Sequence, residues 1–314
     1  MRRLLRLVGL TLVVVVTGLA AVIFVLAPAP RPPLAPAIDI DPIVADLDWQ
    51  PNPASDDRVE RGEVVFRASG CRACHTIDDG ELLAGGRALE TPFGTFYGPN
   101  ITPDPENGIG SWTETEFDQA VRQGIAPDGS PYYPAFPYVS YAGMTDQDVS
   151  DLWAYLQTVP ASDNPSLDHD LSLPYRWRLP LHVWRWLYFE PDGVEVSEGH
   201  PEAWQRGVYL VEVLGHCGEC HTPRTFLGGL DQTVALGGAS AGPDGGSVPD
   251  ITPRALGDWS VSDMTFFFNI GMLPDGDFVG GDMGEVISHG TSQLSNGDRQ
   301  AIAVYLLSLP IPED

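Results

Sequence analysis

The sequence predicts an all-α protein in which two tandem helical domains follow an N-terminal transmembrane helix. Three observations lead to this prediction: an apolar run near the N-terminus, a five-residue cysteine–histidine motif that occurs once in each half, and helix-forming segments in the same order around both copies. At 314 residues the chain is long enough for two domains of ordinary size. We expect a cytoplasmic tip with the anchor, a stalk, a first domain, a connector and a second domain, over residues 1–27, 28–53, 54–160, 161–200 and 201–314.

The N-terminal segment has the features of a membrane anchor. Three arginines, the last of them Arg6, precede an uncharged apolar run from Leu7 to Ala27. About 20 such residues, at ~1.5 Å each, cover the ~30 Å hydrocarbon layer of a bilayer. The arginines should stay cytoplasmic, which places the rest of the chain outside. A cleaved signal peptide is the alternative, but it would have a shorter apolar core and a small-residue cleavage site, and no clear A-x-A follows the run.

The segment from Pro28 to Pro53 holds eight prolines and almost no helical periodicity. Proline fixes φ and favours an extended polyproline II path of about 3.1 Å per residue. This composition predicts a semi-rigid stalk that lifts the domains off the membrane, or a disordered linker with the same consequence.

The repeated motif carries the chemistry of the chain. It reads Cys71-Arg-Ala-Cys74-His75 in the first half and Cys217-Gly-Glu-Cys220-His221 in the second. C-x-x-C-H is the attachment signature of c-type haem: the two thiols form thioether bonds to the porphyrin, and the histidine binds the iron. We therefore predict two covalently bound haem c groups, with His75 and His221 as iron ligands, in two cytochrome c-like domains.

Two other sites with paired cysteines fit the sequence less well. A zinc ribbon needs its second pair roughly 15–20 residues further on, whereas 142 residues lie between Cys74 and Cys217. A thioredoxin-like dithiol requires a βαβ setting and no histidine after each pair. The chain has four cysteines, and all of them belong to the two motifs.

The first domain, residues 54–160, should contain a helix before the motif and two helices after it. A helix that includes Val59 and Phe66 leads to Cys71, and the segment from Gly80 to Gly110 is a long loop with little regular structure. Thr113-Glu-Thr-Glu116 is a capping box that opens a helix to about Gln123. The last helix should run over residues 145–158.

The second domain repeats this plan. We expect its helices over residues 203–214, 262–270 and 295–309. Pro99-Asn-Ile-Thr-Pro103 in the first domain also matches Pro249-Asp-Ile-Thr-Pro253 in the second. One unit has therefore been duplicated. The connector between the two units is rich in aromatic residues from Tyr175 to Phe189, which favours packing across both domains or contact with the membrane interface.

The sixth iron ligand decides whether a haem carries electrons or binds a substrate. Met144 is the candidate in the first domain, in the loop before the last helix, with a core position as the alternative. In the second domain Met264 falls inside a helix and should be core. Met283, in the glycine-rich loop from Gly280 to Gly284, is the candidate there, with Met272 as the alternative. The haem propionates could pair with four side chains, at Arg72, Arg224, Trp112 and Trp259; ordinary packing is equally open for the tryptophans.

The charge of the chain limits its partners. It carries 43 acidic and 17 basic residues, for a formal net charge of −26. Such a surface repels nucleic acid and attracts basic faces of other proteins. Thioether attachment of haem takes place outside the bacterial cytoplasm. We therefore expect anchorage in the bacterial inner membrane, with the haem domains in the periplasm.

Several loops resemble those of one protein family. These include the Asn100-Ile-Thr-Pro-Asp104 loop, Gly108-Ile-Gly-Ser-Trp112, Tyr133-Pro-Ala-Phe-Pro-Tyr138 and Thr222-Pro-Arg224. They are similar to the membrane-bound cytochrome c subunits of periplasmic alcohol, aldehyde and sugar-type dehydrogenases. The resemblance covers about residues 62–310; the best-known members carry three haems, whereas this chain has two motifs. It implies an electron relay from a periplasmic dehydrogenase, carrying pyrroloquinoline quinone, flavin or molybdopterin, to a quinone-linked or oxidase-linked acceptor of the respiratory chain.

Two further functions stay open at this point. A dihaem enzyme such as a peroxidase would need one haem with a vacant sixth position, while each domain here offers a methionine. A thiosulfate-oxidising cytochrome with a distal cysteine is excluded, because no cysteine is spare. A dihaem subunit of a haem–copper oxidase would also combine an anchor with two haems, but the Asn-Ile-Thr-Pro-Asp loop favours the dehydrogenase-linked family.

Overall fold

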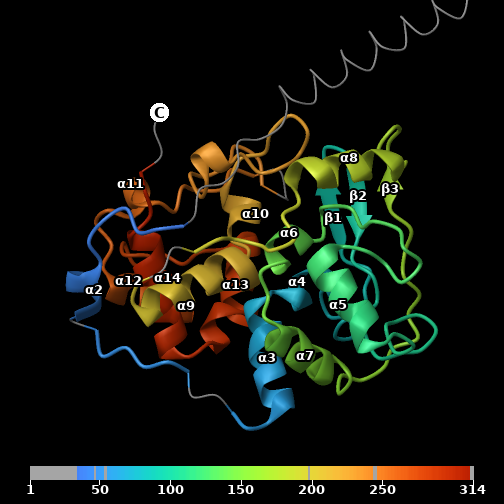
Figure 1. Cartoon of the computed structure of the whole chain (residues 1–314), viewed down its shortest axis with the longest axis horizontal. Coiled ribbons are helices and arrows are strands. Elements are labelled where there is room, and N and C mark those ends of the chain that lie inside the picture. The colour runs from blue at the N-terminus through green and yellow to red at the C-terminus, as the bar shows by residue number, and fades with distance from the viewer. Residues whose placement is uncertain (1–33, 46, 53–54, 197–198, 243–245, 312–314) are drawn as a thin grey trace, which may run out of the picture.

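The computed structural model describes residues 34–45, 47–52, 55–196, 199–242 and 246–311. Over these residues the chain is mainly helical, with two groups of helices side by side and a small sheet at one edge (Figure 1). One hydrophobic core cluster runs through both groups. The two groups of helices therefore share a continuous interior.

The first group follows the predicted order. It consists of α3 (Arg58–Ala68), α4 (Cys71–His75), α5 (Glu114–Gln123), α6 (Tyr138–Tyr141) and α7 (Asp146–Leu156). The predicted capping box of α5 is present: the Glu116 amide donates to Thr113 Oγ1, and the Thr113 amide donates to the Glu116 carboxylate. The helix ends where Gly124 takes the left-handed conformation, as expected for a glycine at this position.

The second group begins with α9 (Glu202–Val208), which continues as a π-helix, Tyr209–Leu214, up to the second motif. Its other helices are α10 (Gly218–His221), α11 (Pro253–Leu256), α12 (Val261–Ile270), α13 (Gly281–His289) and α14 (Asn296–Leu307). Short 3-10 turns lie at Gln232–Val234 and Thr291–Gln293. Trp204 of α9 and Tyr305 of α14 are buried against each other, which explains why this pair of helices is at the centre of the group.

Each group depends on one close crossing of two helices. A Cβ at Gly62 of α3 would lie 2.0 Å from the Asp151 carbonyl oxygen of α7, and a Cβ at Gly207 of α9 would lie 2.1 Å from the Ala301 carbonyl oxygen of α14. Only glycine permits backbones to approach this closely. The same residue at both crossings is structural support for the duplication inferred from sequence.

Replacing Gly62 by alanine should lower the free energy of unfolding by about 1–3 kcal/mol, because the added methyl group overpacks the crossing. Alanine forms helices better than glycine does, but this preference would stabilise the folded state by only about 1 kcal/mol. Guanidinium unfolding followed by circular dichroism measures the change. Gly280→Ala is the matched control, since nothing lies within 4 Å of a Cβ at Gly280. Equal stability of the two variants would contradict the close crossing.

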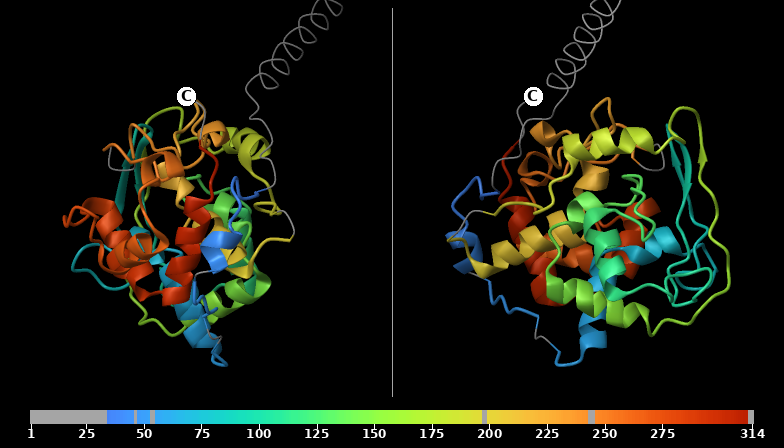
Figure 2. Two further views of the ribbon diagram at one scale, coloured as in Figure 1. Left: turned by 90° about the vertical axis from the view of Figure 1, so that its left-hand side faces the viewer. Right: turned by 45° about the vertical axis from the view of Figure 1, so that its right-hand side comes forward.

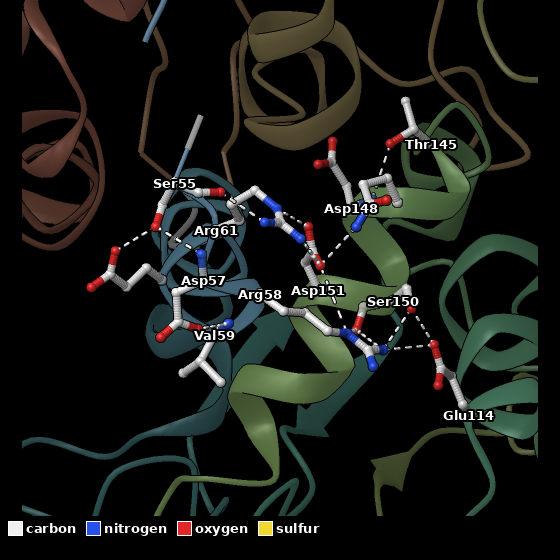
Figure 3. Close-up of polar contacts among 12 residues, drawn as sticks. Ser55, Asp57, Arg58, Val59, Arg61, Glu114, Thr145, Asp148, Ser150 and Asp151 are labelled. Carbon is white, nitrogen blue, oxygen red and sulfur yellow. Dashed lines mark hydrogen bonds and ion pairs between the residues drawn. The ribbon is translucent and has the colours of Figure 1, made fainter. Parts of the chain in front are cut away.

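A buried carboxylate fixes α3 on α7 (Figure 3). The side chain of Asp151 is 0% exposed and accepts two bonds from the Arg61 guanidinium, at 2.7 and 3.0 Å. Gln147 donates a third, at 2.8 Å. Burial alone would raise the pKa of Asp151, but these hydrogen bonds outweigh it and lower the pKa. Arg58 adds an exposed link from α3 to Glu114 of α5, at 2.9 Å.

The prediction of an all-α fold needs a correction. The loop expected over residues 80–110 contains a hairpin of β1 (Ala88–Thr91) and β2 (Gly94–Tyr97), in the register Ala88↔Tyr97. A third strand, β3 (Asp170–Leu171), pairs antiparallel with β2. Four-residue strands leave too short a pattern to separate from a loop, and the third strand comes from far along the chain.

The aromatic connector forms α8 (Leu179–Tyr188) and touches both groups of helices. The Arg178 guanidinium donates to the Pro131 carbonyl of the first group, and the Trp184 indole donates to the Leu227 carbonyl of the second, at 3.1 Å. The side chain of Tyr188 lies against Gly229. Packing across both halves, one of the two predicted roles of this stretch, is therefore present.

Part of the predicted stalk lies on the folded body. The Leu34 amide donates to the Glu195 carbonyl at 2.8 Å, and the Ala37 amide donates to the Ser308 carbonyl at 2.8 Å. Ile40, just before the short helix α2 (Asp41–Ala45), is buried, and the Trp49 indole donates to the Gly297 carbonyl at 3.0 Å. In this part of residues 28–53 the chain is held against the second group and does not stand free.

In the part of the chain that the structure describes, no helix is long and apolar enough to cross a membrane. The predicted anchor, residues 1–27, lies outside the described residues.

Candidate haem sites

The first site is built on α4, which follows α3 after a left-handed turn at Gly70. Cys71 and Cys74 lie one turn apart, and His75 ends the helix. The His75 Nδ1 lies 2.8 Å from the Pro99 carbonyl oxygen. Because a carbonyl oxygen only accepts, Nδ1 carries the proton and Nε2 keeps its lone pair for a metal.

The second site repeats this contact. His221, at the end of α10, has its Nδ1 2.8 Å from the Pro249 carbonyl oxygen. Pro99 and Pro249 are the first residues of the two repeated loops, Pro99–Pro103 and Pro249–Pro253. Their carbonyl oxygens were not among the predicted site groups, although the repeated Pro-x-Ile-Thr-Pro loops were the signal that could have found them.

The residues after each motif are also held in equivalent ways. Thr76 Oγ1 accepts from the Leu83 amide at 3.0 Å, and Thr222 Oγ1 accepts from the Leu236 amide at 2.9 Å. Each threonine is buried directly after its motif. The two sites therefore share their supporting contacts as well as their sequence.

Burial sets the protonation state of both sites. It lowers the pKa of His75 and of His221, while the bond to the proline carbonyl acts in the opposite direction. The neutral imidazole is the form that binds a metal. Burial also raises the pKa of the Cys71 and Cys217 thiols to about 12, and none of the four cysteines forms a disulfide.

The positions of the paired cysteines also bear on the alternative of a shared zinc site. In the described ranges, no group of three or more His, Cys, Asp or Glu side chains could hold a metal ion together. Each motif contributes one histidine, on its own helix.

The candidate sixth ligands lie in different surroundings. Met144 is buried in the core cluster, directly before the Thr145 cap of α7. Met264 is buried on α12, as its predicted core role requires, and Met272 is half-buried. Met283 is half-buried against the core cluster, but the expectation that it lies in a loop is wrong: it belongs to α13. Three glycines in five residues suggested a loop, yet the segment 281–289 forms helical hydrogen bonds.

The two halves differ at the position of Met144. Thr145 caps α7, and Ser295 caps α14 at the equivalent place. The residue before the second cap is Leu294, which is buried and has no atom that binds iron. A sixth ligand in the second half would come from another element, and the predicted candidates there stay Met283, which lies on α13, and Met272.

The four candidate partners of the haem propionates differ in the contacts that they already make within the protein. Arg224 is already paired with Glu219 of the second motif at 2.6 Å. Arg72 makes no hydrogen bond or ion pair through its guanidinium with any described residue. The indole N–H groups of Trp112 and Trp259 likewise donate to no protein acceptor within the described ranges, and Trp259 packs edge-on against Phe267.

Two side chains that the sequence did not single out join the sites. Tyr141 of α6 donates to the Ser69 carbonyl, at 2.7 Å, two residues before the first motif. The ring of His216, directly before the second motif, meets Tyr141 edge-on with centroids 5.5 Å apart. Further along the same interface, Arg87 reaches Glu285 of α13 at 3.3 Å. The segments that lead into the two motifs are thus in contact through Tyr141.

Comparison with known proteins agrees with this geometry. Residues 59–160 match the family model of cytochrome c. A "Diheme cytochrome c-type" protein of Cereibacter sphaeroides is 47% identical over 258 residues, which are 81% of this chain and 86% of that protein. The chain belongs to the cytochrome c family. The predicted cofactor, covalently bound haem c, is thereby confirmed for this cytochrome.

Other relatives of the cytochrome are subunits of larger enzymes. The "Fructose dehydrogenase cytochrome subunit" of Gluconobacter japonicus is 40% identical over 269 residues, 83% of this chain and 55% of that protein. The "Alcohol dehydrogenase (quinone), cytochrome c subunit" of Gluconacetobacter polyoxogenes is 42% identical over 266 residues, 80% of this chain and 56% of that protein. The cytochrome therefore spans little more than half the length of these two relatives.

The residues of both sites fit haem c. Each site has two unpaired thiols one turn apart and an imidazole whose Nδ1 is already bonded, so that Nε2 is left for iron. The free guanidinium of Arg72 and the two indole N–H groups are donors suited to propionate oxygens. In this cytochrome, Cys71, Cys74 and His75 would hold one haem, and Cys217, Cys220 and His221 the other.

Replacing Met144 or Met283 by alanine should leave both haems attached, because the thioether bonds do not involve methionine. One haem in each variant should lose its methionine charge-transfer absorption and bind carbon monoxide readily. Optical spectra and carbon monoxide titration measure both effects. Met264→Ala is the control, since this residue is buried in the core and should change stability only. If Met272→Ala, in place of Met283→Ala, gives the ligand-loss spectrum, the second assignment is wrong.

Proposed function

We propose that this cytochrome is a membrane-tethered electron-transfer subunit, with two haem domains in the periplasm of a bacterium. It takes electrons from a periplasmic dehydrogenase and passes them to an acceptor of the respiratory chain. A bound haem c supplies reversible one-electron chemistry at its iron. The residues of the chain hold, orient and shield that group.

One observation carries the proposal: two equivalent sites are built around one continuous core, with their leading segments in contact. Tyr141 touches both the Ser69 carbonyl and the His216 ring. A hydrogen bond from Tyr209 to Asp148 of α7 joins the same two halves. Two haem sites joined through a shared core in this way suit electron transfer within one chain better than chemistry on a substrate.

The dehydrogenase partner is supported by the relatives and by charge. The relatives named above include cytochrome subunits of alcohol and fructose dehydrogenases. The net charge of −26 would steer a partner with a basic face. The tether is supported by the apolar run at residues 7–27 and the arginines before it.

The electron-transfer proposal predicts a reaction rate that depends on salt. The purified catalytic subunit of a pyrroloquinoline quinone alcohol dehydrogenase, reduced by ethanol, would serve as donor in stopped-flow mixing. We expect the bimolecular rate to fall by about tenfold or more as ionic strength rises from low to physiological and above, because salt screens the attraction. Reduction by neutral duroquinol is the control and should change little.

Two results would overturn the proposed function. If the dehydrogenase reduces the protein no faster than duroquinol does, the dehydrogenase is not its electron donor. Turnover of peroxide by the isolated protein at about 10 per second or more, a rate typical of enzymes, would show that the protein is an enzyme and not an electron carrier.

A further inference from the structure

One face of α8 is turned away from the body of the molecule. Leu181 is buried, and the indole N–H of Trp184 donates inward to the Leu227 carbonyl. Leu179 and Trp186, by contrast, are 79% and 70% exposed. With Val183 they follow the spacing i, i+4, i+7, which puts all three on the same side of a helix. The exposed side of α8 is therefore largely apolar, with His182 as its polar member.

Neighbouring segments extend this surface. Trp177, just before α8, is 63% exposed, and Phe226 is 95% exposed. Phe226 is held beside α8, because Thr225 bonds to the Tyr188 hydroxyl and the Leu227 carbonyl bonds to Trp184. We call the following set the aromatic face: Leu173, Trp177, Leu179, Val183, Trp186 and Phe226. Exposed apolar side chains that gather on one surface mark an interaction site.

The charge around the aromatic face differs from the rest of the chain. Between Leu171 and Phe189 there is no acidic residue, whereas Arg176, Arg178 and Arg185 are all present. None of these arginines forms an ion pair with a carboxylate of the described residues. Arg178 and Arg185 donate to backbone carbonyls instead, and their guanidinium groups lie over the rings of Tyr133 and Tyr138. In a chain of net charge −26, the stretch that carries most of the aromatic face thus has a local excess of positive charge.

The start of the described chain lies beside the segment that follows α8. Leu34, the first described residue, is hydrogen-bonded to Glu195 and paired with Val196, a few residues after α8. The apolar run of residues 7–27 ends shortly before Leu34. In Figures 1 and 2, α8 lies along the top of the molecule, and α3 and α7 lie at the opposite end.

We propose that the aromatic face of α8 rests in the interfacial layer of a phospholipid bilayer and fixes the orientation of the haem domains on the membrane. The inference rests on the tether in the proposed function. Tryptophan and arginine gather where lipid headgroups meet the hydrocarbon, and arginine pairs with lipid phosphate. A basic dehydrogenase would dock on acidic surface, whereas the stretch from Leu171 to Phe189, which carries most of the aromatic face, has no acidic residue. A bilayer is therefore the occupant that its chemistry fits.

Site-directed spin labels test this contact. Because haem attachment uses all four native thiols, a cysteine placed at Leu179 would be the one free thiol of the holoprotein. The full chain, in nanodiscs of phosphatidylethanolamine and phosphatidylglycerol, would carry a nitroxide at Leu179→Cys or, as control, at Gln147→Cys on α7. We expect the label at position 179 to be more accessible to oxygen than to a water-soluble nickel chelate, with the reverse order at position 147.

A second variant keeps the test valid if a label disturbs the helix. Leu179→Asp combined with Trp186→Asp should make the Val183→Cys label water-accessible, although the chain stays in the nanodisc. The haem spectrum should not change, because neither residue belongs to a haem site.

The outcomes separate the inference from the function on which it rests. A water-accessible label at position 179 in a chain that stays with the nanodisc would overturn the inference and leave the tether intact. A label protected only after a dehydrogenase is added would also overturn it, and would make the aromatic face a protein interface. If the chain leaves the nanodisc, the tether fails. Flotation of the released protein with vesicles of the same lipids then decides the inference: binding that the double variant loses by about tenfold supports it, and absence of binding overturns it.

Discussion

Replacing Cys71 and Cys74 together by alanine should halve the covalently bound haem of the purified protein. The two thiols make no disulfide and lie one turn apart directly before His75, so no other pair in the first half could form the thioether bonds. The second motif is on a separate helix with its own proline carbonyl contact, and it should keep its haem. Pyridine haemochrome absorption divided by protein concentration gives the ratio.

The matched control is the equivalent change in the second motif, Cys217→Ala with Cys220→Ala. It should also halve the haem, and the two half-loaded proteins should differ in their reduction potentials because their surroundings differ. Peptide mass spectrometry would show which motif still carries the group. A full haem content in either double variant would mean that the cysteines do not attach it.

The sequence was most informative where chemistry needs adjacent residues. C-x-x-C-H defines the haem attachment within five residues, and the capping box at Thr113 specifies a helix start within four. Both predictions depend on contacts between near neighbours, which the order of residues determines almost alone. The helices over 113–123 and 262–270 were therefore placed to within about one residue, a margin smaller than the usual ambiguity of helix ends.

Contacts between distant segments were harder to predict. The strand β3 pairs with β2 across more than 70 residues, and the four-residue strands give almost no alternating pattern. The proline carbonyls that hold His75 and His221 are backbone groups, so their residue type gives no hint of the role. The contact of Tyr141 with His216 depends on how the two halves meet. None of these can be read from one segment at a time.

Met283 shows a different limit of sequence reasoning. Glycine at positions 280, 281 and 284 favours a loop by local propensity, yet α13 forms because Ile287 is buried against the second group. Tertiary packing outweighs a propensity cost of about 1 kcal/mol per glycine. The residue type was sufficient to nominate a ligand, but the element that carries it was decided by packing.

Asp151→Asn should lower the free energy of unfolding by about 1.5–3 kcal/mol at neutral pH, because it removes the negative charge from a buried side chain that accepts two hydrogen bonds from the Arg61 guanidinium. We expect this loss of stability only where the carboxylate is buried. Asp146→Asn is the control: Asp146 also pairs with an arginine, Arg122, at 2.7 Å, but its side chain is 91% exposed. Exposed pairs contribute about 0–1 kcal/mol, so this variant should unfold almost like the parent protein. Equal losses in the two variants would contradict the role of burial.

The same pair predicts how stability depends on pH. The folded-state pKa of Asp151 is lowered below its ordinary value by Arg61 and Gln147, against the effect of burial. The unfolded state therefore binds the proton first, and the contribution of Asp151 is complete above the unfolded pKa of about 3.9. It is lost as pH falls through the lower folded-state pKa. Guanidinium unfolding of parent and Asp151→Asn proteins should show a difference that is constant from pH 7 to about pH 5 and that shrinks below about pH 4. A difference that grew as the pH fell would mean that Asp151 is stabilised in its protonated form, and that the ion pair does not hold α3 on α7.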